Sequence, residues 1–295
     1  MSRRALLLFA AMSIIWGIPY LFIRIAVEEI TPATLVFWRT TIAAAILLPV
    51  ALARTDLRPV FVRWHWVVAF AAVEIAIPWV ALGSAEQHIT SSLAGLLIAG
   101  VPLVGAAIAL LTGGADRFGP VGLLGMLIGL VGVVAIVGTN FAATDTVALV
   151  QMGIVVVGYA LGPAILARRL DGLPTVGIMA VSLAGCAIAF APIAATQSPT
   201  VMPSAQVVVA VVVLATVCTA AAFLLFGALI DAVGPVRATV ITYINPAVAA
   251  VLGVLVLHET FTVPMAIGFA LVILGSLLAT RPRQAEAPGP TPAAA

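Results

Sequence analysis

The sequence contains very little charge and no lysine. Only 8% of its 295 residues are charged, and all 13 residues in the Lys and Arg class are arginine. A soluble domain carries about 25% charged residues, so the composition excludes a globule exposed to water on every side. Hydrophobic residues make up 63% of the chain, and its mean hydropathy is +1.26. The sequence therefore predicts a membrane protein whose main partner is the lipid bilayer.

Residues that build disulfides and metal sites are also scarce. There are three histidines, and the two cysteines, Cys186 and Cys218, both lie inside apolar runs. Cysteines in such runs usually act as small apolar packing residues, so no disulfide or metal site is expected. The sequence has no Gly-rich phosphate loop and no nucleophile elbow. We therefore expect no enzyme activity, no cofactor and no nucleic-acid partner.

Ten apolar runs are long enough to cross a membrane as helices. Each holds about 18–24 residues, near the length that spans ~30 Å of hydrocarbon, and none alternates as a barrel strand does. The expected spans are 5–27, 33–53, 65–84, 90–111, 119–138, 147–167, 173–195, 206–230, 236–257 and 262–280. Residues 281–295 are rich in Pro and Ala, which predicts a disordered cytoplasmic tail. The expected fold class is an all-α polytopic membrane protein.

The arginines predict the orientation of these spans. If the N-terminus is cytoplasmic, the arginines in cytoplasmic segments are Arg3, Arg4, Arg54, Arg58, Arg63, Arg117, Arg168, Arg169, Arg237, Arg281 and Arg283. The expected external loops hold Glu28, Glu29, Glu86 and Asp145 but no arginine. Because positive charge is enriched in cytoplasmic loops, both termini are expected in the cytoplasm.

Two similar series of landmarks occur about half a chain apart. They are Pro102, Asp116, Gly125 and Gly132 in the first half, and Pro246, Glu259, Gly268 and Gly275 in the second. The prolines are 144 residues apart (246 − 102) and the acids 143 (259 − 116). This spacing predicts two five-helix repeats, residues 1–138 and 147–280. Because five is odd, the second repeat must be inverted, an arrangement typical of transporters.

Glu74 lies near the middle of the third expected span. An ionisable group at that depth costs at least ~2.5 kcal/mol, so it should face an internal cavity and have a partner. One interpretation is that Glu74 carries a proton or binds a substrate amine. The other is structural, either a buried salt bridge or a protonated acid bonded to backbone.

Two arginines lie inside expected spans. Arg39 is about six residues into the second span, and Arg24 is close to the outer end of the first. Arg39 is a candidate for substrate or gating electrostatics, with a structural tie to a neighbouring helix as the alternative. Arg24 can reach the membrane interface with its charged end. The sequence does not decide whether Glu74 pairs with Arg39 or with Arg24.

Glycine and proline interrupt matching helices of the two repeats. The interruptions and the aromatic residues beside them are Gly17, Pro19, Trp16 and Tyr20 in the first repeat, and Gly162, Pro163 and Tyr159 in the second. Proline removes a backbone hydrogen bond and kinks a helix. Paired interruptions point to a transporter's midplane site. The three aromatic residues are therefore candidates to line a substrate path, although such residues also serve as packing.

Pro102 and Pro246 form a second matched pair of breaks, in the fourth and ninth expected spans. Beside Pro246, Tyr243 and Asn245 are candidates to bind a polar substrate, or to bind backbone carbonyls freed at the kink. Trp79 is a further candidate to line a cavity, with lipid-facing packing as the alternative.

The chain resembles the drug/metabolite transporter superfamily, specifically its EamA type with two five-span repeats. The resemblance covers residues 5–280. The residues that carry it are Trp16-Gly17 with Arg24, Pro32 with Arg39, and the stretch from Arg237 through Asn245-Pro246 and Gly253 to Glu259. Asp116 stands where the first repeat of the family usually has Glu, and Glu74 is not part of the general family pattern.

The resemblance implies a secondary carrier of the bacterial inner membrane that works by alternating access. Its cargo would be small metabolites such as amino acids or amphipathic compounds, and export is the expected direction. Proton coupling and facilitated transport are both open, as are a monomer and a homodimer. A channel and a non-transporting membrane protein are the alternatives from other functional classes.

Overall fold

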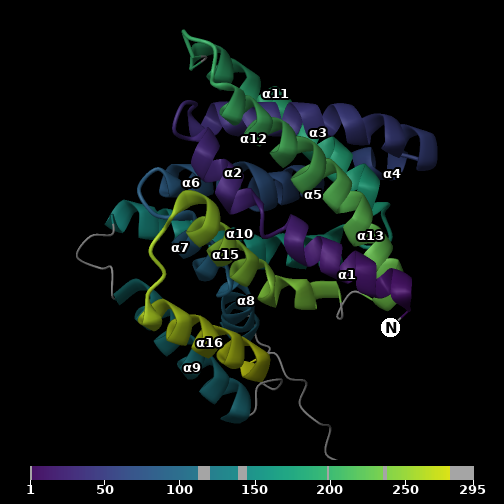
Figure 1. Cartoon of the computed structure of the whole chain (residues 1–295). Coiled ribbons are helices and arrows are strands. Elements are labelled where there is room, and N and C mark those ends of the chain that lie inside the picture. Colours follow the sequence, from purple (N-terminus) through teal and green to yellow (C-terminus); the bar gives the residue numbers. More distant parts are fainter. Residues whose placement is uncertain (1, 112–119, 139–144, 198, 235–237, 280–295) are drawn as a thin grey trace, which may run out of the picture.

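A computed structural model describes residues 2–111, 120–138, 145–197, 199–234 and 238–279 (Figure 1). Within these residues every regular element is a helix, and no strand occurs. Asp116 and the expected tail at 281–295 lie outside the described residues. The described part of the chain is therefore all-α, as its composition predicts.

The helices follow one another with short connections. In the first half they are α1 (Arg3–Ile15), α2 (Pro19–Ala26), α3 (Pro32–Arg54), α4 (Arg58–Val62), α5 (Trp64–Phe70), the π-helix η1 (Ala71–Ala76), α6 (Ile77–Glu86), α7 (Ser91–Ile98), α8 (Val101–Ala109) and α9 (Pro120–Gly138). In the second half they are α10 (Thr146–Arg169), α11 (Thr175–Thr196), α12 (Ala205–Ala215), the π-helix η4 (Thr216–Ala221), α13 (Ala222–Val233), the 3-10 helix η5 (Thr239–Tyr243), α15 (Asn245–Leu257) and α16 (Val263–Ala279).

Several helices begin at a capping side chain. Thr31, Thr90, Asp145 and Ser204 each accept a backbone N–H in the first turn of α3, α7, α10 and α12. A cap of this kind contributes about 1 kcal/mol. Because the first N–H groups of a helix have no partner within the helix, these four residues fix where the apolar runs become helical.

Eight helical segments of the described chain are long and apolar enough to cross a membrane. They span 3–26, 32–54, 64–86, 91–109, 120–137, 146–169, 175–196 and 205–233. Two shorter apolar segments follow, over 241–257 and 263–279. All these segments coincide within a few residues with the expected spans. The chain is a polytopic α-helical membrane protein.

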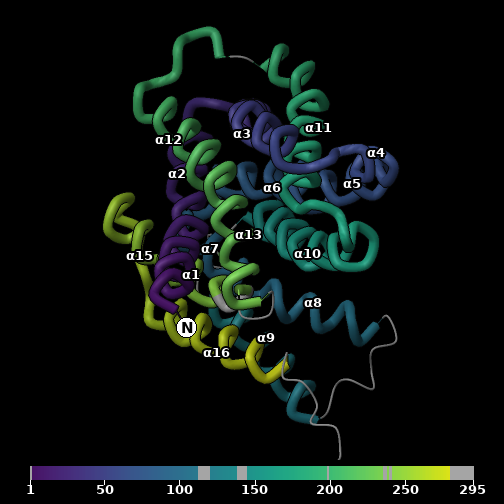
Figure 2. The backbone as a smooth tube through the Cα atoms, turned by 90° about the vertical axis from the view of Figure 1, so that its right-hand side faces the viewer, coloured from purple at the N-terminus to yellow at the C-terminus, as the bar shows by residue number. Residues whose placement is uncertain are grey.

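The most extensive helix contacts join the two halves of the chain. α9 packs along α16, α3 along α11, α6 along α10, α7 along α15 and α2 along α12. Figures 1 and 2 show α9 and α16 side by side at one edge of the bundle. Neither half is therefore a separate bundle, since each helix in these pairs has its main neighbour in the other half.

Glycines allow the closest of these contacts. A methyl group at Gly132 would lie 2.7 Å from the carbonyl oxygen of Gly268, and one at Gly125 would lie 2.8 Å from that of Gly275. Small residues let helix backbones approach one another in lipid, where packing drives association. The glycines that recur in the two halves of the sequence thus meet across the α9–α16 pair.

Two helices contain π-helical turns at corresponding places. η1 lies between α5 and α6, and η4 lies between α12 and α13. They begin 145 residues apart (216 − 71), close to the spacing of the other landmarks. Such turns are rare and occur frequently at functional sites. The sequence analysis predicted neither.

The structure corrects the break expected at Gly162 and Pro163. Residues 16–18, which include Gly17, separate α1 from α2, but α10 runs through Gly162 and Pro163 without interruption. Proline is tolerated inside a membrane helix where neighbouring helices compensate for the lost hydrogen bond. α10 has such support because it packs along α6 and η1.

Three other prolines lie in the first turn of a helix. Pro19 begins α2, Pro102 lies in the first turn of α8, and Pro246 lies in the first turn of α15. Proline suits this position because its missing N–H would have no partner within the helix. These prolines therefore mark places where one helix ends and another starts.

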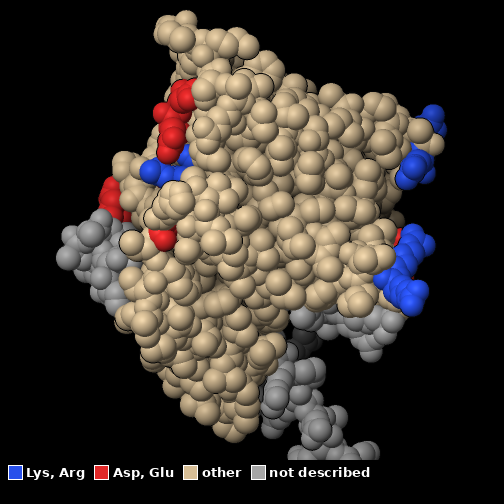
Figure 3. All heavy atoms as spheres, viewed as in Figure 1, with Lys and Arg blue, Asp and Glu red and all other residues tan. Residues whose placement is uncertain are grey.

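Charged side chains gather at two opposite ends of the bundle (Figure 3). The exposed arginines of the described chain are Arg3, Arg4, Arg54, Arg58, Arg63, Arg168 and Arg169, and most blue side chains in Figure 3 lie at the right-hand end, where Figure 1 places α4 and the start of α1. Exposed acids include Glu28, Glu29 and Asp145, and also Asp56 and Asp171 in the segments that carry the arginines, and most red side chains in Figure 3 lie at the opposite end. Between the two ends, the face that Figure 3 shows carries no charged side chain, as expected of a surface in contact with hydrocarbon.

Replacing Gly132 with Ala is expected to destabilise the protein. The added methyl would lie 2.7 Å from both the Gly268 carbonyl oxygen and the Val272 nitrogen, and overpacking of this kind costs about 1–3 kcal/mol of unfolding free energy. Thermal unfolding in detergent micelles measures the change. Gly185→Ala is the matched control, because a methyl there meets no atom within 4 Å. Equal stability of the two variants would contradict the close packing of α9 on α16.

Candidate functional site

Arg39 of α3 is a buried cation, with 6% of its surface exposed. Its Nε donates a hydrogen bond to Oγ1 of Thr219 in η4 at 2.9 Å. Its guanidinium carbon lies 3.6 Å from the centroid of the Trp79 ring in α6. A desolvated cation on an aromatic face contributes about 2 kcal/mol. These contacts hold one edge and one face of the guanidinium.

Thr219 is itself held in one orientation. Its hydroxyl donates to the backbone carbonyl oxygen of Leu214, five residues earlier, at 2.7 Å. The hydroxyl proton is therefore used within the distorted helix, and an oxygen lone pair is left for Arg39. The π-helical turn η4 thus presents an acceptor to a cation from the other half of the chain.

The other edge of the Arg39 guanidinium has no hydrogen-bond partner among the residues that the structure describes. Among the described residues, the bond to Thr219 is its only hydrogen bond, and no carboxylate forms an ion pair with it. A guanidinium with its two terminal nitrogens free is suited to bind a carboxylate through two parallel hydrogen bonds. The geometry therefore favours an anion-binding role.

Aromatic residues surround Arg39. Tyr20 of α2 and Tyr159 of α10 are both near enough to Arg39 to interact electrostatically with it, and Tyr159 packs against the hydrophobic cluster that holds Tyr20 and against the one that holds Trp79. Tyr20 and Trp79 are 6% and 7% exposed. The structure thus brings together Arg39, Tyr20, Trp79 and Tyr159, all singled out from the sequence. With Thr219 they form what we name the Arg39 cluster.

Glu74 lies beside the Arg39 cluster, on η1. Its carboxyl group packs against Gly162 of α10 and interacts electrostatically with Tyr159. Its Oε2 is buried and has no hydrogen-bond partner among the described residues. Neither Arg39 nor Arg24 forms an ion pair with it in the described chain. The reason is direction, because Glu74 faces α10 while Arg39 is held between α6 and η4.

Glycines of α10 make room for η1. A methyl group at Gly158 would lie 2.6 Å from the backbone carbonyl oxygen of Val73, and one at Gly162 would overlap the carboxyl of Glu74. Gly162 therefore acts as a close-contact position, not as a helix break. It allows the Glu74 carboxyl to lie between two closely packed helices.

Trp16 lies outside the Arg39 cluster. At the end of α1 it packs against Phe223 and Phe226 of α13, with ring centroids 6.4 and 4.7 Å apart. These aromatic contacts join α1 to the second half of the chain. They support the packing interpretation of Trp16.

Asn245 makes structural hydrogen bonds. With its amide nitrogen placed to donate, it bonds to the backbone carbonyl oxygens of Ser13 and Ile241, both at 2.9 Å. Asn245 thus serves carbonyls near two helix ends, which is one of the two roles expected for it. Tyr243 is the last residue of η5 and is half-buried.

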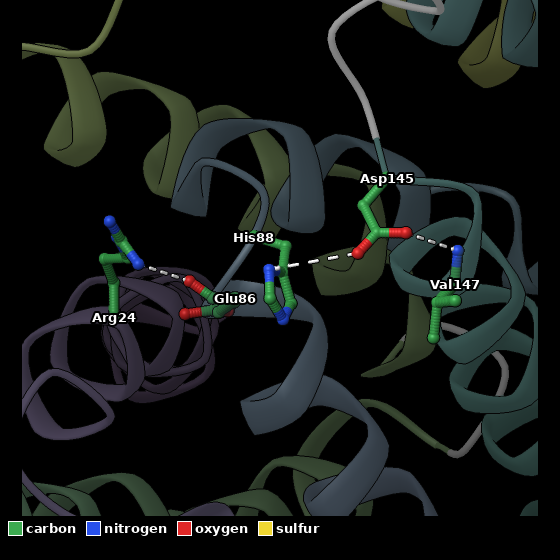
Figure 4. A network of polar contacts seen from close by, with 5 residues as sticks. All are labelled: Arg24, Glu86, His88, Asp145 and Val147. Carbon is green, nitrogen blue, oxygen red and sulfur yellow. Dashed lines mark hydrogen bonds and ion pairs between the residues drawn. The ribbon is translucent and has the colours of Figure 1, made fainter.

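Arg24 meets Glu86 near the acid-rich end of the bundle (Figure 4). Nη1 of Arg24 donates to the backbone carbonyl oxygen of Glu86 at 2.6 Å. Glu86 is the last residue of α6 and is fully buried, and both of its carboxyl oxygens lack a hydrogen-bond partner among the described residues. The expectation that Glu86 lies in a loop is wrong, because α6 continues to it and packs against α2 and α7.

Figure 4 also shows His88 and Asp145, which come from different halves of the chain. His88 Nδ1 and Asp145 Oδ2 are 3.9 Å apart, and both side chains are largely exposed. An exposed pair of this kind contributes about 0–1 kcal/mol. We therefore assign it no role in the candidate site.

Two further acids join the halves at the same end. Glu259 accepts the backbone N–H groups of Ser91 and Ser92 at 2.8 Å and the Ser92 hydroxyl at 2.5 Å, at the start of α7. Glu29 accepts the Ser204 N–H at 2.7 Å, at the start of α12. Hydrogen bonding with Ser204 lowers the pKa of Glu29, so this contact weakens only when the pH falls through that lowered pKa. Both carboxylates also suit the positive end of a helix dipole.

An apolar groove of about 520 Å³ lies between η1–α6 and α10. Val73, Ile77, Ile154 and Gly158 are among its lining residues. It borders the segment that carries Glu74, but its lining is apolar. It therefore contributes no polar recognition to the site.

The sequence analysis missed Thr219 and Glu86. Thr219 corresponds to Glu74, because 145 residues separate the two (219 − 74), as they separate η4 from η1. The repeat spacing of 143–144 residues points to Val217 or Cys218, so the sequence indicated the neighbourhood of Thr219 but not the residue itself. No feature of the sequence indicated that Glu86 is buried, because an acid that follows an apolar run resembles a loop residue.

Arg39→Lys is expected to lower the free energy of unfolding by about 1–3 kcal/mol. Lysine keeps the charge but has no Nε edge to bind Thr219 and no planar group to stack on Trp79. Thermal unfolding in micelles measures this loss. Arg54→Lys, at the exposed end of the same helix, is the control. Equal effects of the two substitutions would show that the contacts of Arg39 contribute nothing to stability.

Comparison with known proteins supports one family. A profile of the EamA-like transporter family matches residues 3–138 and 147–281. A protein of Escherichia coli strain K12, described as the uncharacterized inner membrane transporter YedA, is 29% identical over 296 residues, covering 94% of this chain and 92% of the relative. The proteins of the same name in Escherichia coli O157:H7 and in strain CFT073 match equally.

A solved structure supports the fold. A crystal structure of another protein has a TM-score of 0.66 and 23% identity, and the match covers 95% of this chain and 97% of that one. The resemblance found in the sequence is confirmed by the family profile, which matches nearly the whole chain. The protein belongs to the EamA-like transporter family.

Proposed function

We propose that this protein is a secondary transporter that exports small metabolites, such as amino acids or amphipathic compounds, across a bacterial inner membrane. The observation that carries the proposal is the Arg39 cluster, a buried guanidinium with one free edge between the two halves of the chain. Family membership supports transport in general. The description of the relative as an inner membrane transporter supports the location.

The architecture that we propose is ten spans in two inverted repeats, residues 1–138 and 147–280. The helix pairing supports it. If each helix is replaced by its counterpart in the other half, the pairs α3–α11, α7–α15 and α9–α16 remain the same pairs. The same replacement converts the contact of α10 with the span α5–η1–α6 into the contact of the span α1–α2 with the span α12–η4–α13. The matched π-helices and the reciprocal glycine contacts follow the same rule. Two related halves can open a central site to each side in turn.

Arg39 would bind the anionic group of the substrate. An isolated buried charge costs several kcal/mol unless it is paired, and the free edge of Arg39 has no anion within the described chain. A substrate carboxylate would supply the missing counter-charge. Trp79, Tyr20 and Tyr159 would offer aromatic surface to the rest of the molecule.

Glu74 would carry the proton that couples transport to the proton gradient. An unpaired carboxyl group at this depth is typical of a proton or ion path, and its Oε2 is buried without a partner. Glu74 and Arg39 both interact electrostatically with Tyr159. Tyr159 therefore links the proton site to the substrate site without direct contact between the two charges.

Both termini would lie in the cytoplasm. The exposed arginines gather at the end of the bundle where α1 begins, and cytoplasmic loops are enriched in positive charge. An impermeant thiol reagent applied to spheroplasts is expected to label Glu28→Cys. It should label Arg58→Cys only after the membrane is permeabilised. The native Cys186 and Cys218 are buried, so background labelling should be low, and the reverse pattern would refute this orientation.

Loss of proton coupling is expected in Glu74→Gln, because glutamine fills the same space but cannot take up or release a proton. The assay is a pH jump in proteoliposomes, with proton movement followed across a panel of amino acids and amphipathic amines. The wild type should show substrate-dependent proton movement, and the variant should fall to background. Glu28→Gln, which removes an exposed acid, is the control.

Other outcomes of the same assay separate the alternatives. Saturable transport without proton movement in the wild type would identify a facilitator and leave Glu74 a structural role. Flux that does not saturate would identify a channel. Unchanged proton movement in Glu74→Gln would rule out the coupling role of this residue.

A further inference from the structure

We infer that Glu86 forms a second substrate subsite opposite Arg39, which binds the ammonium group of a zwitterionic substrate. The inference rests on the proposed transport through the Arg39 cluster and adds a specificity-determining residue to it. It assigns different roles to the two acids of the α5–η1–α6 segment. Glu74 would carry the proton, and Glu86 would recognise the amine.

The first argument is the direction in which Glu86 points. Glu86 and Trp79 are seven residues apart in α6 (86 − 79), which corresponds to about two turns, about 10 Å of rise and an offset of about 20°. They therefore lie on one face of the helix, and Arg39 is stacked on Trp79. Glu74 lies before α6 on η1, and its carboxyl faces Gly162 of α10.

The second argument is the electrostatic surroundings of Glu86. Its charged neighbours are Glu259, Arg24 and Arg39, and both tyrosines of the Arg39 cluster also interact with it. No ion pair within 4.0 Å joins Glu86 to Arg39 in the described chain. The two groups are therefore near enough to interact electrostatically but form no direct ion pair among the described residues.

The third argument is that the neighbours of Glu86 hydrogen-bond to groups other than its carboxyl. Arg24 donates to its backbone carbonyl oxygen, and the carboxylate of Glu259 is bonded to Ser91 and Ser92. Both carboxyl oxygens of Glu86 are left buried and without a donor among the described residues. A buried polar group in this state is costly until a partner arrives.

The unmet groups of Arg39 and Glu86 are complementary. Arg39 has donors without an acceptor, and Glu86 has acceptors without a donor. An α-amino acid carries both missing partners, a carboxylate for Arg39 and an ammonium with three N–H donors for Glu86. A bound zwitterion would satisfy both residues at once, whereas a plain carboxylic acid would satisfy only Arg39.

The experiment compares amino acids with their des-amino analogues in proteoliposomes. The probes are L-leucine with 4-methylpentanoate, L-phenylalanine with 3-phenylpropanoate, and L-threonine with 3-hydroxybutanoate. The wild type is expected to have a lower KM for the amino acid of a transported pair. Glu86→Gln should raise that KM by about 10- to 100-fold, as expected for loss of a hydrogen bond between charged groups. It should thereby remove the preference over the analogue, while Glu28→Gln should keep it.

The outcomes separate this inference from the proposed function. An unchanged preference in Glu86→Gln would overturn the ammonium subsite but leave transport intact. A wild type that prefers the des-amino analogues would overturn it as well. A wild type that moves no member of any pair would refute both proposals for this cargo class.

A second variant distinguishes loss of the carboxylate from a change in packing at Glu86. Glu86→Asp keeps a carboxylate but shortens the side chain by one methylene group. It is expected to retain a reduced preference for the amino acid, with insertion and thermal stability checked in parallel. If the aspartate and glutamine variants lost the preference equally, the carboxylate would not be the recognising group and the inference would fail.

Discussion

A guanidinium that is removed from water needs compensating contacts, and at Arg39 these contacts come from helices of both halves of the chain. Arg39 receives an acceptor from η4 and an aromatic face from α6. Its tyrosine neighbours come from α2 and α10. These elements belong to both halves of the chain, so the charge is compensated only when the halves are packed together. The remaining edge is the part that the described residues leave without a hydrogen bond.

The π-helical turns η4 and η1 orient Thr219 and Glu74 toward different neighbours. The hydroxyl of Thr219 in η4 donates a hydrogen bond to a backbone carbonyl oxygen and accepts one from Arg39. Glu74, at the corresponding place in η1, instead lies between closely packed helices beside Gly162. Corresponding positions thus carry an acid in one half and a neutral hydroxyl in the other. This difference makes the polar centre asymmetric even though the helix pairing is close to symmetric.

Sequence reasoning located the helices well, because long apolar runs and capping residues such as Thr31 and Thr90 determine where a membrane helix can start and end. It also identified Arg39, Tyr20, Trp79 and Tyr159 before their contacts were known. The sequence did not predict which neighbour each of these side chains faces. Hydropathy gives the depth of a residue but not the neighbour that it faces, and an extra residue in η1 or η4 shifts the phase of a helix without a sequence signature.

The same limit explains the errors at Pro163 and Glu86. A proline marks a weak point in an isolated helix, but contacts made by α10 with α6 and η1 decide whether the helix breaks there. An acid after an apolar run usually reaches water, but α2 and α7 pack against the segment that carries Glu86. Both outcomes depend on tertiary contacts between residues far apart in the chain.

The separation of exposed arginines from exposed acids has a further consequence for a protein in an energised membrane. One end of the bundle carries more arginines than acids and the other carries mainly acids, so the molecule has an electric dipole along the direction in which its helices cross. A voltage of 100 mV acts on each elementary charge moved across the bilayer with about 2.3 kcal/mol. With the arginine end on the negative side, the resting voltage stabilises the inserted orientation, and depolarisation removes that contribution.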